Sequence, residues 1–181
     1  TLASDCVKLA TASTTSSHST IDVEGHFDDT VYGHYKLIMH SIKPENNSGE
    51  ITAKWMTSSS ATHDSGNYLQ LHTGYMSSSG SSKGEQNRGY WNVNAFNDWE
   101  GTWTPKATGT GDYQYCSMVA DIINPQSTSQ GKAILYQFGT FSTTNGVMIT
   151  ANGHMFTNSN TAMTGFRLYR DSNGFEQSAW E

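Results

Sequence analysis

The chain has 181 residues and a formal net charge of −6, and only 14% of its residues are charged. This length suits one domain with a sizeable core, which needs neither a metal nor a disulfide to fold. The acidic balance excludes ordinary duplex nucleic-acid binding, and no apolar run approaches the roughly 20 residues of a membrane helix, so we expect no nucleic-acid partner and no membrane insertion.

The residue pattern predicts an all-β fold, an antiparallel two-sheet β-sandwich. Long helical patterns are missing, and short apolar segments alternate with clusters of Gly, Ser, Asn and Asp. About eight such strands, each with one apolar face, predict two packed sheets in a jelly-roll-like arrangement. The predicted strands are 35–42, 50–57, 67–75, 117–123, 132–141, 146–150, 153–157 and 165–169.

The clearest strand covers residues 35–42. Tyr35, Leu37 and Met39 point to one face and Ile38 to the other. Because both faces carry apolar groups, we expect a central strand, and Pro44 ends it because proline cannot donate to a ladder. The first 19 residues have one weak apolar cluster and are expected to form an N-terminal arm, with residues 20–181 as a single sandwich domain.

Two polar, glycine-rich stretches are predicted to be long loops. Residues 76–84 are rich in Ser and Gly, and residues 91–111 form a second irregular stretch. Long loops in a compact domain are usually functional or disordered. We expect these two to form the outward or partner-facing surface.

Aromatic side chains gather in the middle third of the chain. Exposed Trp and Tyr side chains stack on sugars or anchor protein interfaces, although packing in the core is the commoner role of such residues. The candidate contacts for a glycan or a protein partner are Tyr90, Trp91, Trp99, Trp103 and Tyr113.

No residue pattern here predicts catalysis or a cofactor. Asp98 and Glu100 are two apart, as paired carboxylates of a glycosidase could be, but a polar loop explains them better. His26, His34 and His40 lack the spacing of zinc ligands. We therefore expect no catalytic residue, no metal and no cofactor.

The two cysteines are far apart in sequence. Cys6 and Cys116 belong to no CxxC pair, and two buried free thiols are the simpler interpretation. A disulfide between them is the alternative, since one pair is too weak a pattern to decide the redox compartment.

Several short blocks in order resemble structural proteins of tailed phages, particularly cyanophages and other marine phages. Residues 27–44 read F-D-D-T-V-Y-G-H-Y-K-L-I-M-H-S-I-K-P, an acidic turn followed by a strand. A Ser-Gly-x-Tyr turn follows at 65–68, and an Asn-Pro turn ends the strand at 122–125. A Phe-Arg-Leu-Tyr strand at 166–169 and a polar turn at 172–175 complete the set. Each block is short, and their order and spacing carry the resemblance.

The resemblance spans about residues 20–180 and implies a non-enzymatic β-sandwich of the virion, assembled in the host cytoplasm. It implies a tail, fibre or capsid-decorating protein that associates with itself and with other virion proteins. A host cell-surface glycan is a further partner if the protein forms a receptor-binding tip. A carbohydrate-binding module that uses the loop aromatics is the alternative function.

Proteins of this kind commonly end with one more strand. This sequence stops at Trp180-Glu181, before such a strand. We expect either a piece of a longer chain or a strand supplied by another copy. In the first case, the edge next to residues 165–169 is left unpaired.

Overall fold

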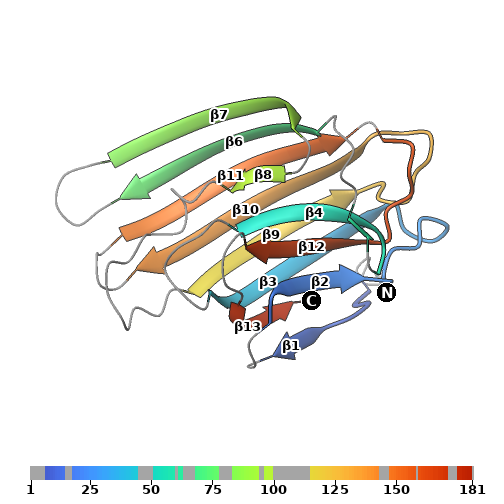
Figure 1. The fold of residues 1–181 in the computed structure, drawn as a ribbon, viewed down its shortest axis with the longest axis horizontal. Coiled ribbons are helices and arrows are strands. Elements are labelled where there is room, and N and C mark those ends of the chain that lie inside the picture. The colour runs from blue at the N-terminus through green and yellow to red at the C-terminus, as the bar shows by residue number, and fades with distance from the viewer. Residues whose placement is uncertain are drawn as a thin grey trace, which may run out of the picture.

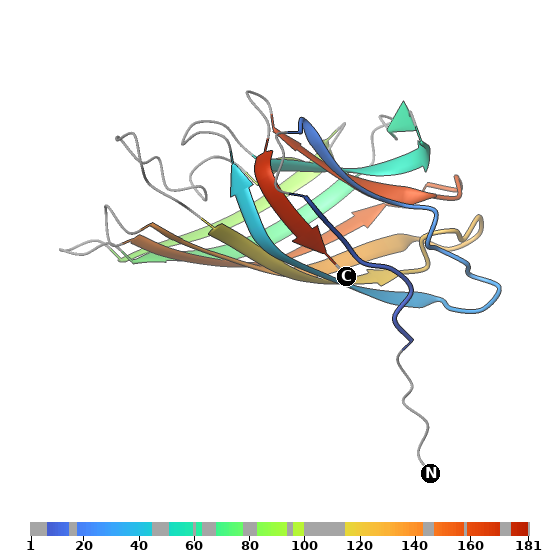
Figure 2. The ribbon, with the colours of Figure 1, turned by 90° about the horizontal axis from the view of Figure 1, so that it is seen from below.

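Two antiparallel β-sheets pack against each other (Figure 1), and Figure 2 shows them as two layers. A computed structural model describes residues 7–14, 18–44, 51–59, 61–62, 68–77, 83–93, 96–99, 115–142, 147–157, 159–170 and 175–180. All regular elements within these residues are strands, so the predicted all-β sandwich is confirmed. The jelly-roll-like connectivity stays a prediction.

The larger sheet has eight strands and the smaller sheet has five. The larger sheet runs in the order β1 (Ala12–Thr14), β13 (Phe175–Trp180), β3 (His34–Pro44), β9 (Tyr115–Ile123), β10 (Lys132–Ser142), β11 (Val147–Thr157), β6 (Tyr68–Ser77) and β7 (Lys83–Val93). The smaller sheet runs in the order β2 (Thr20–Glu24), β12 (Gly165–Arg170), β4 (Ile51–Ser58) and β5 (Ala61–Thr62), with β8 (Phe96–Trp99) also paired to β4.

The core lies between the sheets because alternate residues of each strand point inward. In β3, Tyr35 and Leu37 are buried, whereas His34 and Lys36 are exposed. Fully burying a large apolar side chain contributes about 1.5–3 kcal/mol, so this alternation holds the two layers together. The smaller sheet and the segment that follows β2 pack against β3, β9 and β10, and the residues that do so are Ile21, Val23, Phe27, Trp55, Phe166 and Leu168.

The clearest predicted strand is confirmed as a central one. Residues 35–42 lie inside β3, which pairs with β9 on one edge and β13 on the other. Pro44 is its last residue, as the missing N–H of proline requires. The strands predicted at 50–57, 67–75, 117–123, 132–141 and 165–169 are also present with small shifts at their ends.

The predicted break between residues 150 and 153 is wrong, because Val147–Thr157 form the single strand β11. Gly153 pairs directly with Tyr136 of β10. A Cβ atom at Gly153 would lie 2.0 Å from Cζ of the Tyr136 ring, which is only 5% exposed. The glycine therefore makes room for a buried ring and does not mark a turn.

The predicted loops are also partly wrong. Lys83–Val93 form β7, which pairs with β6 from Tyr68 to Ser77, and Phe96–Trp99 form β8. Long backbone pairing with β6, with one register shift between Tyr68 and Leu69, compensates for the weak apolar alternation of β7. Residues 100–111 lie outside the described residues.

The unpaired edge expected beside residues 165–169 is wrong as well. β12 pairs with β2 on one side and with β4 on the other. No strand was expected at Thr20–Glu24 or at Phe175–Trp180, where β2 and β13 form. β13 lies between β1 and β3, and β1 is formed by residues of the predicted N-terminal arm.

Candidate functional site

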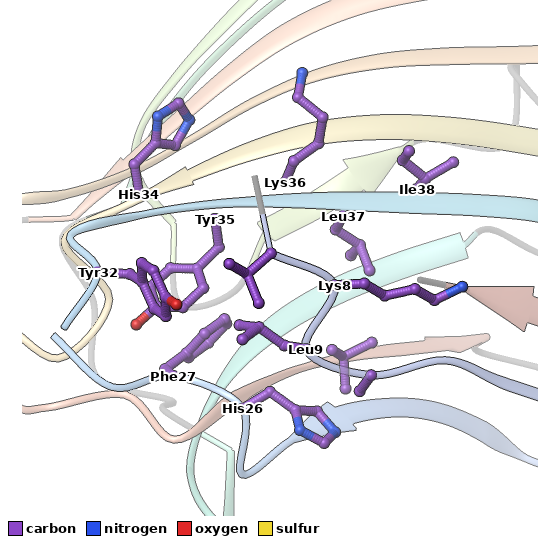
Figure 3. Close-up of a pocket in the computed structure, with 13 residues that line it drawn as sticks. Lys8, Leu9, His26, Phe27, Tyr32, His34, Tyr35, Lys36, Leu37 and Ile38 are labelled. Atoms are coloured by element: carbon purple, nitrogen blue, oxygen red, sulfur yellow. The ribbon is translucent and has the colours of Figure 1, made fainter. Parts of the chain in front are cut away.

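A groove of about 560 Å³ lies along one edge of β3, beside residues 7–10 (Figure 3). Phe27 and Leu37 belong to its apolar lining. In Figure 3, Leu37 points from β3 toward Leu9 and Phe27, whereas His34 and Lys36 point to the opposite side of the strand. The groove thus presents mainly apolar surface on the inner side of β3.

The groove exists because β13 covers only part of the β3 edge. β13 pairs with β3 from Met39 to Pro44, whereas β9 pairs along the other edge from His34. Among the described strands, the stretch of β3 at residues 34–38 therefore has β9 as its one neighbour. The register of β1 on β13 makes β1 parallel to β3, so residues 7–10 run along this stretch.

The exposed part of the groove's apolar lining comes from residues 7–10, because Phe27 and Leu37 are buried. Val7 is 61% exposed and Leu9 is 46% exposed, although both line the groove. An extended peptide can bind such a place by adding a strand to the sheet edge while its side chains enter the apolar groove. The geometry favours a peptide or protein partner.

A cluster of aromatic rings connects the groove to the core. The ring centroids of Phe27 and Tyr35 are 4.9 Å apart, and those of Tyr32 and Tyr35 are 6.3 Å apart. Phe27 also contacts Trp55, with 6.4 Å between the ring centroids, and Trp55 meets Phe166 at 6.2 Å. These edge and tilted contacts make the wall of the groove part of the core.

The Tyr35 hydroxyl anchors the acidic turn above the groove. The backbone N–H of Asp28 donates to the Tyr35 hydroxyl oxygen at 2.5 Å, and this hydroxyl lies 3.5 Å from Oδ1 of Asp29. Burial raises the pKa of Tyr35, and the charges of Asp29 and Asp28 raise it further, against a lowering effect of the Asp28 hydrogen bond. The hydroxyl therefore stays protonated at neutral pH.

The acidic turn is locked to the Asn-Pro turn after β9. The N–H of Gln126 donates to Oδ2 of Asp29 at 2.8 Å, and the N–H of Asp29 donates to Oε1 of Gln126 at 3.2 Å. The N–H of Asn124 donates to the Gly33 carbonyl at 2.8 Å. Asn124 has φ of 51°, a left-handed conformation that asparagine tolerates better than most residues.

A fully buried lysine holds the same end of the sandwich. Nζ of Lys132 donates to the backbone carbonyls of Ser127 at 2.5 Å and Ser159 at 2.7 Å. Burial lowers the pKa of Lys132, and the charge of Asp29 partly opposes that shift. The ammonium group thus joins two loops that have no strand pairing with each other.

His34 and Lys36 lie at the edge of the groove, but their side chains point to the outward side of β3 and meet Asp121 there. Oδ1 of Asp121 lies 3.1 Å from Nζ of Lys36 and 3.2 Å from Nε2 of His34. Burial alone would raise the pKa of Asp121, but the hydrogen bonds and charges of Lys36 and His34 outweigh it and lower the pKa. These groups cross-link β3 and β9 near the groove end of the strands.

The predicted aromatic contacts are divided between the two sheets. Tyr90 and Trp91 are on β7, where they pair with residues 70 and 69 of β6, and Trp99 is on β8 beside β4. Trp103 and Tyr113 lie outside the described residues, as do the side chains of the other three. A shared glycan surface formed by these residues stays a prediction.

Among the other candidates for chemistry, the structure brings two histidines to the same groove. Asp98 is on β8, and Glu100 lies outside the described residues. His26 and His34 both line the groove, whereas His40 lies farther along β3 and is not part of that lining. Within the part of the chain that the structure describes, no group of three or more His, Cys, Asp or Glu residues could hold a metal ion. The described residues also include no helix with the length and apolar character of a membrane span.

The groove itself was missed by the sequence analysis. Its position depends on where β13 stops along β3, which no local pattern encodes. The signal that could have indicated it is the alternation of Val7, Lys8, Leu9 and Ala10, a short strand-like pattern in the predicted arm. In a comparison with known proteins, no family model, no curated protein and no solved structure matches this chain.

Proposed function

We propose that this chain is a structural protein of a tailed-phage virion that acts through protein–protein assembly and not through catalysis. The observation that carries the proposal is the position of two sequence blocks that resemble such proteins. Residues 27–44 and 122–125 are far apart in sequence, yet a hydrogen bond joins Asn124 to Gly33. These two blocks lie at adjacent ends of the paired strands β3 and β9, so they form one unit of the sandwich, as a resemblance to a single architecture requires.

The groove supports an assembly role. It combines a partly open strand edge with exposed apolar side chains on residues 7–10. A strand edge of this kind pairs readily with another chain. A neighbouring virion protein, or another copy of this chain, is the partner that such an edge fits.

The finer parts of the proposal concern connectivity, place and adhesion. We assign the sandwich a jelly-roll-like connectivity and a position in the tail, a fibre or the capsid surface, with assembly in the host cytoplasm. In a receptor-binding tip, the aromatic residues at 90, 91, 99, 103 and 113 would contact a host glycan. Low charge over the whole chain supports side-by-side packing of copies, because few charged groups then lose water.

Cryo-electron microscopy of intact particles of the encoding phage tests this function. The expected result is density for this sandwich at a defined symmetry position, with the chain found by mass spectrometry of the same purified particles. Absence of the chain from the particles would overturn the virion role. Glycan-array binding by the purified protein would then support the carbohydrate-binding alternative.

Two valine substitutions test whether the groove serves this assembly. Val7 is 61% exposed and lines the groove, and Val31 is 62% exposed and lies outside its lining. We expect Val7→Asp to reduce incorporation of the chain into particles, because it places a charge beside an apolar contact. Val31→Asp is the matched control and should incorporate normally. Equal incorporation of both variants would exclude the groove as the assembly contact.

A further inference from the structure

The outward side of the larger sheet carries an apolar patch. Its members alternate with the core residues of β3, β9, β10 and β11. Val119 is 39% exposed and Phe156 is 43% exposed, and the smaller sheet packs on the opposite side of these strands. The outer patch consists of Ile38, Val119, Ile123, Ala133, Leu135 and Phe156.

Strand register makes the outer patch continuous. Ile38 of β3 is directly opposite Val119 of β9. Ile123 of β9 is opposite Ala133 of β10, which is in turn opposite Phe156 of β11. Cross-strand partners of this kind are about 4.5–5.5 Å apart at Cβ. Leu135 is opposite Asp121 and diagonal to both Val119 and Ile123, so it links the two groups of apolar side chains around the Lys36–Asp121 pair.

The outer patch carries no net formal charge. Among the outward positions of these four strands whose side chains are described, the formally charged residues are Lys36 and Asp121. Nζ of Lys36 lies 3.1 Å from Oδ1 of Asp121, so the two charges compensate each other within the face. The chain as a whole carries −6, so this neutrality is local. This face therefore offers no excess charge of either sign to attract a strongly charged partner.

The size and form of the face fit another sheet. The four strands have nine to eleven residues each. At about 3.3 Å per residue and about 4.8 Å between strands, the whole face of these four strands covers roughly 700 Å², and the outer patch is one part of that face. A standard protein interface buries about 800 Å² per partner, and β6 and β7 extend the same sheet beyond these four strands.

We propose that the outer patch is the surface through which two copies of this chain pack face to face. A second copy presents a neutral apolar sheet of the same twist, and two such sheets pack about 10 Å apart with strands roughly 30° from alignment. Because the same patch meets itself, the contact closes as a twofold dimer. This inference names the self-association surface of the proposed assembly function and rests on that function for its biological role.

Sedimentation equilibrium of the purified full chain tests the inference, with no need for particles. We expect a monomer–dimer equilibrium that Val119→Lys weakens by roughly tenfold or more, since a buried lysine in an apolar contact loses its hydration. Gln137→Lys is a second variant, because Gln137 is exposed on this face directly opposite Val119 and contributes no apolar packing to lose. It should weaken the dimer in the same direction.

Val31→Lys is the matched control, because Val31 is an exposed valine on the turn before β3 and is not one of the outward strand positions that form the outer patch. It should leave the dimer intact, and circular dichroism should show folded protein for all variants. A monomer at all accessible concentrations would overturn the inference, and so would a dimer that Gln137→Lys leaves unchanged. A chain that dimerises through this face but is absent from particles would contradict the virion role alone.

Discussion

The two outward faces of the sandwich differ in how they meet solvent. On the smaller sheet, Arg167 of β12 lies in register between Asp22 of β2 and Lys54 of β4. On the larger sheet, the corresponding outward positions include the exposed Val119 and Phe156. Both faces carry charged groups in register, and on the larger sheet these are Lys36 and Asp121. Among the described strand residues, the exposed large apolar side chains lie on the larger sheet. The outward face of the smaller sheet is therefore compatible with contact with water, and that of the larger sheet is compatible with packing against another protein.

On the outward face of the smaller sheet, an arginine is paired with an aspartate of the same chain. Nε and Nη2 of Arg167 donate to Oδ1 and Oδ2 of Asp22, both at 2.7 Å. The Asp22 hydrogen bonds raise the pKa of Arg167, against a lowering effect of burial, so the guanidinium stays charged. This bidentate pair needs no partner from another chain.

The largest expected loss of stability comes from a substitution on the inward side of β12, and it is compared with a substitution on the outward side. Phe166 is 1% exposed and contacts Trp55, so Phe166→Ala leaves a cavity and should lower the free energy of unfolding by about 3–5 kcal/mol. Urea unfolding followed by tryptophan fluorescence measures it. If Phe166→Ala lowers the free energy of unfolding by less than a substitution of the outward Arg167 does, the assignment of the two sides of β12 is contradicted.

Alanine substitution of two glycines compares the inward and the outward side of the larger sheet. Gly153→Ala would place Cβ 2.0 Å from the buried Tyr136 ring, so we expect a loss of about 1–3 kcal/mol from overpacking. Gly139 is the control, because a Cβ there would lie 3.7 Å from Oγ of Ser117 and meet no clash. Gly139→Ala should be neutral or stabilise by up to about 1 kcal/mol. Thermal unfolding measures the stability of both variants. Equal losses of stability for Gly153→Ala and Gly139→Ala would contradict the difference between the two sides of the sheet.

Removing the charged pair on the smaller sheet should have a more modest effect. Arg167→Met keeps much of the side chain's apolar contact but removes both hydrogen bonds to Asp22. Because both partners are partly exposed, we expect a loss of about 1 kcal/mol, smaller in high salt. The double variant with Asp22→Asn measures the coupling. Absence of coupling would show that the pair does not stabilise this face.

The sequence pattern predicted those strands whose apolar and polar residues alternate. β3 could be predicted because Tyr35, Leu37 and Met39 alternate with outward residues and Pro44 ends the strand. β11 was divided in two because Gly153 resembles a turn residue, whereas its reason is the distant ring of Tyr136. β7 was missed because its pairing with β6 stabilises a sequence with little apolar alternation.

The groove and the outer patch depend on relations between strands. The groove forms because β13 leaves residues 34–38 of β3 uncovered, and the patch forms because Val119, Ala133 and Phe156 come into neighbouring register. Register between strands follows from the whole fold, so no window of sequence contains it. The acidic turn and the Asn-Pro turn were visible as motifs, but their hydrogen bonds to each other were not.

The smallest expected effect concerns an ion pair on the larger sheet's outer face, the pair between Lys36 and Asp121. Asp121 has a pKa lowered by Lys36 and His34 despite burial, so its contribution is present above the unfolded-state pKa and is lost as the pH falls through the folded-state pKa. Lys36→Ala should raise the pKa of Asp121 and make the acid loss of stability shallower, by less than about 1 kcal/mol because both groups are exposed. Carboxyl titration by NMR measures the pKa, and urea unfolding across the acid range measures the stability. An unchanged Asp121 titration would mean that Lys36 does not neutralise this face, and the case for a neutral surface between two copies would weaken with it.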